Sequence, residues 1–219
     1  GMHKALEDIE TIICSGIIYH IQNHHQFFKN MTKYREELLS IFEETNALLK
    51  GHFILRSGMR SGHFFQCAQV CQYMDKVTRL ASIMIAEMPF QNINTVAAPA
   101  MGGLVMGQEV ARQLNARFVF LEKIDDKLEL RRNFKLEKED KVLVVEDVVT
   151  KGGRLAEAIE IIKGLNCELS GAVSLVDRST EKLTLSVPFF GLLKMNFPTY
   201  EPESLPDELA KLPAIKPGS

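Results

Sequence analysis

The chain has 219 residues, of which 46% are hydrophobic and 25% are charged, and this is the size and composition of one ordinary globular domain. Its 26 basic and 28 acidic residues give a formal net charge of -2, so no excess of cations favours nucleic acid or an anionic membrane. No apolar run reaches the roughly 20 residues that a bilayer-spanning helix needs. We therefore expect no nucleic-acid or membrane partner, and an anionic ligand would need a local site.

The four cysteines, at positions 14, 67, 71 and 167, predict free thiols and a cytoplasmic location. They are too few for a disulfide framework and lack the spacing of a zinc ribbon. Cys67 and Cys71 could share a helix face, but no neighbouring residues complete a set of metal ligands. The apolar stretch 11–21 follows acidic residues and lacks a signal-peptide cleavage site, so secretion is not expected.

The first elements in chain order follow an N-terminal extension, residues 1–30, whose role the sequence does not indicate, and Gly1 is typical of a tag remnant. The domain is expected over 31–219. Apolar residues at helical spacing predict a helix from Tyr34 that includes Leu48 and Leu49, with Gly51 as its stop signal. Two Ser-Gly pairs within 52–66 separate short extended pieces and predict a small hood at about 50–70.

Beyond the hood, helices and strands alternate over a core region at about 72–197. We expect helices at 73–88, 105–114 and 155–165 and strands at 95–98, 118–121, 141–145 and 169–176. This alternation predicts an α/β fold with a central, mainly parallel sheet flanked by helices on both faces. The charged segment 123–139 predicts a mobile loop or ribbon outside the core. The tail 198–219 contains five prolines and predicts an extended surface segment.

A buried strand followed by a phosphate-binding turn starts at Lys141. The apolar run 141–145 is typical of a strand covered on both faces, and ligands bind beyond the carboxyl ends of such strands. There the glycines at 152 and 153 lead directly into a helix, so backbone N–H groups and the helix dipole favour a phosphate. Thr150 adds a hydroxyl, and Lys151 and Arg154 add positive charge.

Glu146 and Asp147 precede this turn, and two carboxylates beside a phosphate would repel it. They make sense if they face hydroxyl groups or a metal ion, and the 2- and 3-hydroxyls of ribose meet that requirement. The segment therefore predicts a site for a phosphorylated ribose.

The thirteen residues Val142–Arg154 resemble the diphosphoribosyl-binding motif of type I phosphoribosyltransferases. A chance turn containing Gly-Gly is the competing interpretation. The resemblance implies 5-phosphoribosyl 1-diphosphate as a substrate, Mg²⁺ as a cofactor carried by that substrate, and Asp147 as a catalytic residue. It leaves no certain protein ligand for the metal, with Asp147 as a candidate. The substrate contacts that it implies are Glu146, Asp147, Val148, Val149, Thr150, Lys151, Gly152, Gly153 and Arg154.

Other segments, from about residue 34 to 219, resemble the orotate phosphoribosyltransferase family, whose product is orotidine 5'-phosphate in UMP biosynthesis. The hood sequence implies orotate contacts from Arg56, Phe64 and Phe65, and Val176-Asp-Arg178 implies one from Arg178. A flat ring with a carboxylate suits an aromatic face and a guanidinium. Because neighbouring strand residues alternate, one of the two phenylalanines is expected in the core.

Two loops complete this resemblance. Ala98–Gly103 resembles the diphosphate loop, which implies backbone donors at Met101, Gly102 and Gly103. The position of 123–132 corresponds to the family's catalytic loop, which in dimers reaches the partner's site, so a homodimer is expected. The resemblance implies catalytic lysines and diphosphate-binding arginines in this loop, namely Lys123, Lys127, Arg131 and Arg132.

The chain also departs from the family pattern. The loop lacks the Lys-Asp-His-Gly pattern, Gly102 stands where a lysine is common, Arg154 replaces a hydroxyl residue, and the tail lacks a Cys-Pro-x-Cys pair. Two alternatives stay open. One is the same fold acting on a purine base. The other is a non-catalytic diphosphoribosyl sensor that regulates transcription, with residues 1–30 binding a partner.

Overall fold

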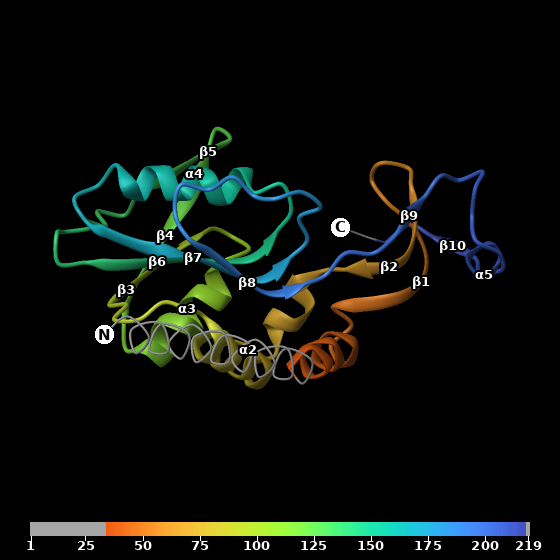
Figure 1. Cartoon of the computed structure of the whole chain (residues 1–219), viewed down its shortest axis with the longest axis horizontal. Coiled ribbons are helices and arrows are strands. Elements are labelled where there is room, and N and C mark those ends of the chain that lie inside the picture. Colours follow the sequence, from red (N-terminus) through yellow and green to blue (C-terminus); the bar gives the residue numbers. More distant parts are fainter. Residues whose placement is uncertain (1–33, 218–219) are drawn as a thin grey trace, which may run out of the picture. The chain divides into compact units, whose positions relative to one another are not determined.

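The structure of the chain is a computed structural model that describes residues 34–217 (Figure 1). The expected N-terminal extension, Gly1 and Cys14 lie outside the described residues. The chain divides into two compact units, 1–40 and 41–219, and the elements below belong to the second. No helix within 34–217 is both long and apolar enough to cross a membrane.

The described elements of the second unit form two sheets and the helices that accompany them. In chain order they are β1 (Leu48–Ile54), β2 (Arg60–Phe65), the 3-10 helix η1 (Cys67–Gln72), α2 (Met74–Glu87), β3 (Thr95–Pro99), α3 (Leu104–Leu114), β4 (Arg117–Ile124), β5 (Lys127–Leu130), β6 (Lys141–Val149), α4 (Gly153–Lys163), β7 (Glu168–Asp177), β8 (Phe189–Lys194), β9 (Thr199–Tyr200), α5 (Asp207–Ala210) and β10 (Ala214–Ile215).

The larger sheet has six strands in the order β5-β4-β3-β6-β7-β8. All neighbouring pairs are parallel except β4 and the edge strand β5. Helices α2 and α3 lie on one face of this sheet and α4 lies on the other (Figure 1). The predicted α/β fold, with a mainly parallel sheet covered on both faces, is therefore confirmed.

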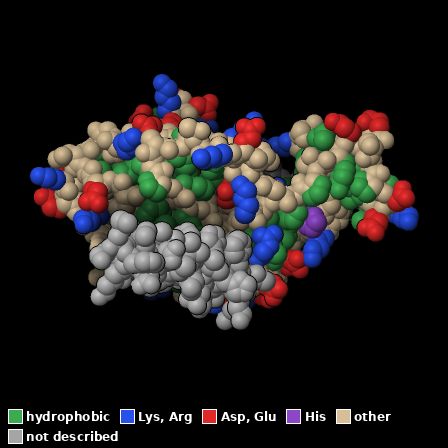
Figure 2. All heavy atoms as spheres, in the orientation of Figure 1, with side chains coloured by type: hydrophobic (Ala, Val, Ile, Leu, Met, Phe, Trp, Pro, Cys, Tyr) green, Lys and Arg blue, Asp and Glu red, His purple; other side chains and the backbone are tan. Residues whose placement is uncertain are grey.

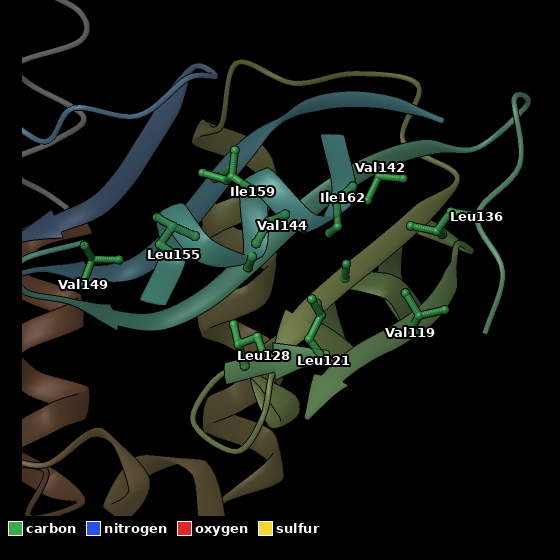
Figure 3. Packing of buried hydrophobic residues seen from close by; sticks show 13 residues of the cluster. Val119, Leu121, Leu128, Leu136, Val142, Val144, Val149, Leu155, Ile159 and Ile162 are labelled. Atoms are coloured by element: carbon green, nitrogen blue, oxygen red, sulfur yellow. The ribbon is translucent and has the colours of Figure 1, made fainter. Parts of the chain in front are cut away.

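The core between α4 and the sheet explains why 153–163 is a helix. Leu155, Ile159 and Ile162 recur every three or four residues and are at most 1% exposed, so they form one apolar face. They pack in one cluster with Val142 and Val144 of β6 (Figure 3). This packing fixes the start of α4 directly beyond the end of β6.

The smaller sheet forms the hood, in the order β10-β1-β2-β9. Strands β1 and β2 are an antiparallel pair, while β9 joins β2 and β10 joins β1. The proline-rich tail is extended in part, as predicted, but it is not only a surface segment. It supplies both outer strands of the hood sheet, and Leu209 of α5 is buried with 7% exposure.

The prediction that Leu48 and Leu49 continue the first helix was wrong. The helix ends at residue 44, and both leucines belong to β1. Asn46 has a φ of 58°, in the left-handed region, which is a common way to end a helix. Gly51, expected as the stop signal, lies within β1 next to an irregularity in its pairing.

The segment 123–139 forms the predicted ribbon in part, but the expectation that it lies wholly outside the core was wrong. Strand β4 extends to Ile124, and Asp125 and Asp126, with φ of 46° and 66°, turn the chain into β5. Positive φ at both turn residues is typical of a two-residue hairpin. Leu128 and Leu136 are buried, with 4% and 6% exposure, among charged neighbours that face solvent. Most residues of this segment are exposed and many are charged, so the sequence did not indicate that Leu128 and Leu136 join the core.

Candidate active site

Three of the predicted functional segments, namely the diphosphate loop, the acidic pair with its phosphate turn, and Arg178, lie at the carboxyl-end edge of the large sheet. Because β3, β6 and β7 are parallel neighbours, the residues that follow them emerge on the same edge. Strand β6 runs to Val149, four residues past its predicted end at 145, so the acidic pair is part of the strand. Val149 is 3% exposed and packs in the core, which leaves its main chain as the only part that a substrate can contact.

Glu146 and Asp147 are held by local hydrogen bonds. The Asp147 N–H donates to Glu146 Oε1 at 3.0 Å, and the Val148 N–H donates to Asp147 Oδ1 at 2.7 Å. Glu146 is only 6% exposed. Burial, with the nearby charge of Asp147, raises the pKa of Glu146 to about 9. A neutral carboxyl group beside a carboxylate can both donate to and accept from sugar hydroxyls.

The loop after β3 lies directly against this acidic pair. A Cβ atom placed on Gly102 would be 2.7 Å from Asp147 Oδ1, a separation that real Cβ atoms do not show. This contact gives a physical reason why glycine stands where the family often has lysine. The Gly103 N–H donates to the Pro99 carbonyl at 3.1 Å. This amide is therefore already bonded, contrary to the prediction that it donates to diphosphate. Met101, which is 83% exposed, and Gly102 remain as candidate donors.

The phosphate turn Thr150–Gly153 connects β6 to α4. Gly152 has a φ of 80°, a conformation that favours glycine. The N–H groups of the first turn of a helix have no partner within that helix, so they point outward. A cavity of about 100 Å³ is lined by Glu146 and by residues 148–155, and it joins the acidic pair to this turn.

A segment that the sequence did not single out closes the turn from the other side. Leu183 lies so close that its Cδ2 would be 2.9 Å from a Cβ atom on Gly152. Residues 150–153, Ala156 and residues 180–185 together line a larger cavity of about 430 Å³. No sequence pattern marks 180–185 as part of a site, because the segment has neither regular structure nor a motif.

Arg178 follows the end of β7 next to the phosphate turn. Its N–H donates to the Val149 carbonyl at 2.8 Å. The neighbouring carboxylate of Asp177 accepts from the Ser179 hydroxyl at 2.6 Å and from Lys194 Nζ at 3.0 Å. These hydrogen bonds engage both carboxylate oxygens of Asp177. Burial lowers the pKa of Arg178, and a half-buried cation of this kind favours an anionic ligand.

The two hood phenylalanines predicted to contact orotate, Phe64 and Phe65, have different surroundings. Phe65 is 7% exposed and packs edge-on against Phe42, with ring centroids 5.0 Å apart. It is a core residue, so the expectation that it contacts orotate is wrong, and strand alternation is the reason. Phe64 is half-buried, 5.8 Å from the Phe53 ring, and Arg56 is exposed in the turn between β1 and β2.

The predicted catalytic loop is the β4–β5 hairpin and the residues after it. Lys123 forms an ion pair with Asp126 at the turn, and Lys127 is exposed. Arg132 binds both carboxylate oxygens of Glu122, at 2.7 and 2.8 Å. This ion pair is exposed, so the expected role of Arg132 toward diphosphate stays a prediction. Arg131 is exposed.

The described part of the chain has three cysteines, and its surface carries charges of both signs. Cys67, Cys71 and Cys167 are free thiols, and residues 34–217 contain no cluster of three metal-ligating side chains. Basic and acidic side chains alternate over the visible face and do not gather by sign (Figure 2).

Comparison with known proteins defines the class. Residues 69–200 match the phosphoribosyl transferase domain. The chain is 46% identical to the orotate phosphoribosyltransferase of Erythrobacter litoralis over 187 residues, which cover 84% of this chain and 97% of the relative. The enzyme of that name from Desulforamulus reducens is also 46% identical, over 185 residues, with the same coverage. The chain therefore belongs to the phosphoribosyltransferase family, and within it to the orotate phosphoribosyltransferases.

Solved structures show the same fold. Orotate phosphoribosyltransferase from Aeropyrum pernix matches with a TM-score of 0.62 at 20% identity, over 72% of this chain and 93% of that one. Adenine phosphoribosyltransferase from Rhodothermus marinus matches with a TM-score of 0.57 at 18% identity, over 72% and 99%. The fold alone thus accommodates more than one base, and residues of the site must decide between them.

Proposed function

We propose that the chain transfers the 5-phosphoribosyl group from 5-phosphoribosyl 1-diphosphate to orotate, giving orotidine 5'-phosphate and diphosphate for pyrimidine biosynthesis. The observation that carries the proposal is the acidic pair and phosphate turn of β6 beside the half-buried Arg178 of β7. The first group suits a ribose phosphate, and Arg178 suits the carboxylate of orotate. Relatives that share 46% of the residues carry this name.

In the proposed reaction, orotate N1 forms a bond to ribose C1 while the bond from C1 to the diphosphate oxygen breaks. Positive charge develops on C1 and the ring oxygen, as in glycosyl transfer generally. Glu146 and Asp147 hold the ribose hydroxyls and so fix C1 relative to the base. The orotate N1 proton leaves before the transfer, so no general base is required. Phe64 and Arg56 contact the orotate ring from the hood.

The turn Thr150–Gly153 holds the 5-phosphate through its N–H groups, and Lys151 and Arg154 add charge. Mg²⁺ fits this site as a companion of the substrate. Residues 34–217 offer no cage of three ligands, whereas Mg²⁺ commonly uses one or two carboxylates together with substrate phosphates. Asp147 would hold the ion, which supplies charge neutralisation to the leaving diphosphate.

The β4–β5 hairpin carries Lys123 and Lys127, which we assign to closure over the diphosphate, together with the exposed Arg131. Following the family resemblance, the protein acts as a homodimer in which this hairpin contacts the partner's site. The free thiols of Cys67, Cys71 and Cys167 support a reducing, cytoplasmic environment.

A purine base is the competing substrate, since adenine enzymes share the fold. The protein is incubated with Mg²⁺, 5-phosphoribosyl 1-diphosphate and, separately, orotate, uracil, adenine, hypoxanthine or xanthine, and diphosphate release is measured. We expect release with orotate alone. Release with a purine and none with orotate would overturn the base assignment. Tight binding of 5-phosphoribosyl 1-diphosphate, with no diphosphate released in the presence of any of the five bases, would favour a sensor.

A further inference from the structure

The carboxylate of Glu157 contacts two parts of the molecule that sequence separates. One oxygen, Oε1, accepts the Leu128 N–H of β5 at 2.6 Å. The other, Oε2, lies 3.6 Å from Arg154 Nη1 in the first turn of α4. A single side chain thus lies between the hairpin and the end of the phosphate turn.

The contact with Leu128 anchors an edge strand. Within residues 34–217, strand β5 pairs with β4 alone, so its outward amides need other acceptors. A charged acceptor makes the stronger type of hydrogen bond. The Leu128 side chain belongs to the same buried cluster as Leu155 of α4 (Figure 3). Both the backbone and the side chain of Leu128 therefore fix the hairpin to α4.

The contact with Arg154 leaves a donor unused. Arg154 Nη1 is buried and has no hydrogen-bond partner among the described residues, because 3.6 Å is an ion-pair distance and not a hydrogen bond. A buried donor without an acceptor is unfavourable, so an anion at the phosphate turn would be favoured. The pKa of Asp126 in the hairpin turn is lowered by Lys123 and, more weakly, by the charge of Arg154. The hairpin turn is thus within the electrostatic reach of Arg154.

We propose that Glu157 is a positioning residue that couples occupation of the phosphate turn to the placement of the β4–β5 hairpin. Phosphate binding draws the Arg154 guanidinium toward the ligand, and Glu157 transmits the change to the Leu128 amide. The lysines of the hairpin are thereby held where the diphosphate leaves. The inference rests on the proposed function, since it assigns the turn to the 5-phosphate and the hairpin to the diphosphate.

Two substitutions separate the two contacts. Glu157→Gln keeps a carbonyl oxygen for the Leu128 N–H and removes the charge that faces Arg154, whereas Glu157→Ala removes both. Glu160→Gln, one turn further along α4, is the matched control. Amide hydrogen exchange of the peptide that contains β5 is measured with and without Mg²⁺ and 5-phosphoribosyl 1-diphosphate, alongside kcat and KM for orotate transfer.

In the parent we expect the ligand to slow exchange in β5 at least about 5-fold. In Glu157→Gln the unliganded rate should stay near the parent's while the ligand response disappears. Glu157→Ala should exchange about 10-fold faster without ligand and lose about 10-fold in kcat. The control should match the parent in every respect. Should Glu157→Ala fail to fold, the Gln variant alone decides the coupling.

An unchanged ligand response in Glu157→Gln would overturn the proposal. Faster β5 exchange with unchanged kcat in Glu157→Ala would also overturn it, because a merely structural contact would give that pattern. An absent ligand response in the parent would also overturn it. Failure of the proposed function has a different signature, because the parent would then bind 5-phosphoribosyl 1-diphosphate and respond in β5 but would release no diphosphate with orotate.

Discussion

Glu146→Gln should make the unliganded protein more stable while it impairs catalysis. The carboxyl group is 6% exposed and its pKa is raised, chiefly by burial, from 4.5 to about 9. A raised carboxyl pKa means that the folded state binds the proton more tightly than the unfolded state. The stability of the parent therefore falls as pH rises from about 4.5 toward 9.

The magnitude follows from the part of this window below neutrality. From pH 4.5 to 7, a window of 2.5 units, the parent loses at most about 3.5 kcal/mol of folding free energy, at about 1.4 kcal/mol per unit. Relaxation around a buried charge reduces such values, so we expect a gain of about 1 to 3 kcal/mol in the variant. Glutamine retains the oxygen that accepts the Asp147 N–H, so this hydrogen bond survives.

Thermal unfolding is measured for both proteins at pH 5, 7 and 8, with the exposed Glu139→Gln as the control. At pH 7 the variant should unfold at least about 2 to 4 °C higher, and the difference should grow with pH. Orotate turnover should fall at least about 10-fold, because a contact to the ribose is altered. An equal or lower unfolding temperature at pH 8, or a difference that does not change with pH, would refute the reasoning.

Substitutions at three further positions test the site and the hood. Arg178→Ala should raise KM for orotate at least about 10-fold with little change in KM for 5-phosphoribosyl 1-diphosphate, and Arg178→Lys should recover part of the loss; equal effects on both substrates would contradict the assignment. Gly102→Ala places a Cβ 2.7 Å from Asp147 Oδ1. The affinity for 5-phosphoribosyl 1-diphosphate, measured by calorimetry, should therefore fall about 10-fold or more. Affinity equal to the parent's would show that the loop moves to accommodate the methyl group. Leu209→Ala should cost about 2 kcal/mol in denaturant unfolding, and no loss would indicate that α5 does not support the hood.

The sequence predicted the four inner strands of the large sheet and the phosphate turn because their signals are local, whereas the edge strands β5 and β8 were not predicted. The apolar run at 141–145, the Gly-Gly pair and the following helix each depend on neighbouring residues, and the structure brings them together as expected. The failures depend on non-local pairing. Leu48 and Leu49 fit a helix or a strand equally well, and only their partners in β2 decide between these structures.

Contacts between distant segments explain the remaining omissions in the site. Leu183 packs on the phosphate turn and Glu157 binds the β5 backbone, yet neither lies in a recognisable motif. Likewise, the sequence indicates that Arg132 is a cation but not that it pairs with Glu122. Such pairings follow from tertiary geometry, which local sequence patterns do not reveal.

The hood sheet can be completed only after its outer strands, β9 and β10, have been synthesised. Strand β9 starts at Thr199 and β10 ends at Ile215, while the hairpin that they flank begins at Leu48. During translation the β1–β2 pair therefore has both edges unpaired until residues 199–215 have been synthesised and have paired with it. A two-stranded pair is marginal alone and its open edges favour aggregation. A chain truncated before Thr199 would therefore contain every strand of the large sheet but would leave the β1–β2 pair with two open edges.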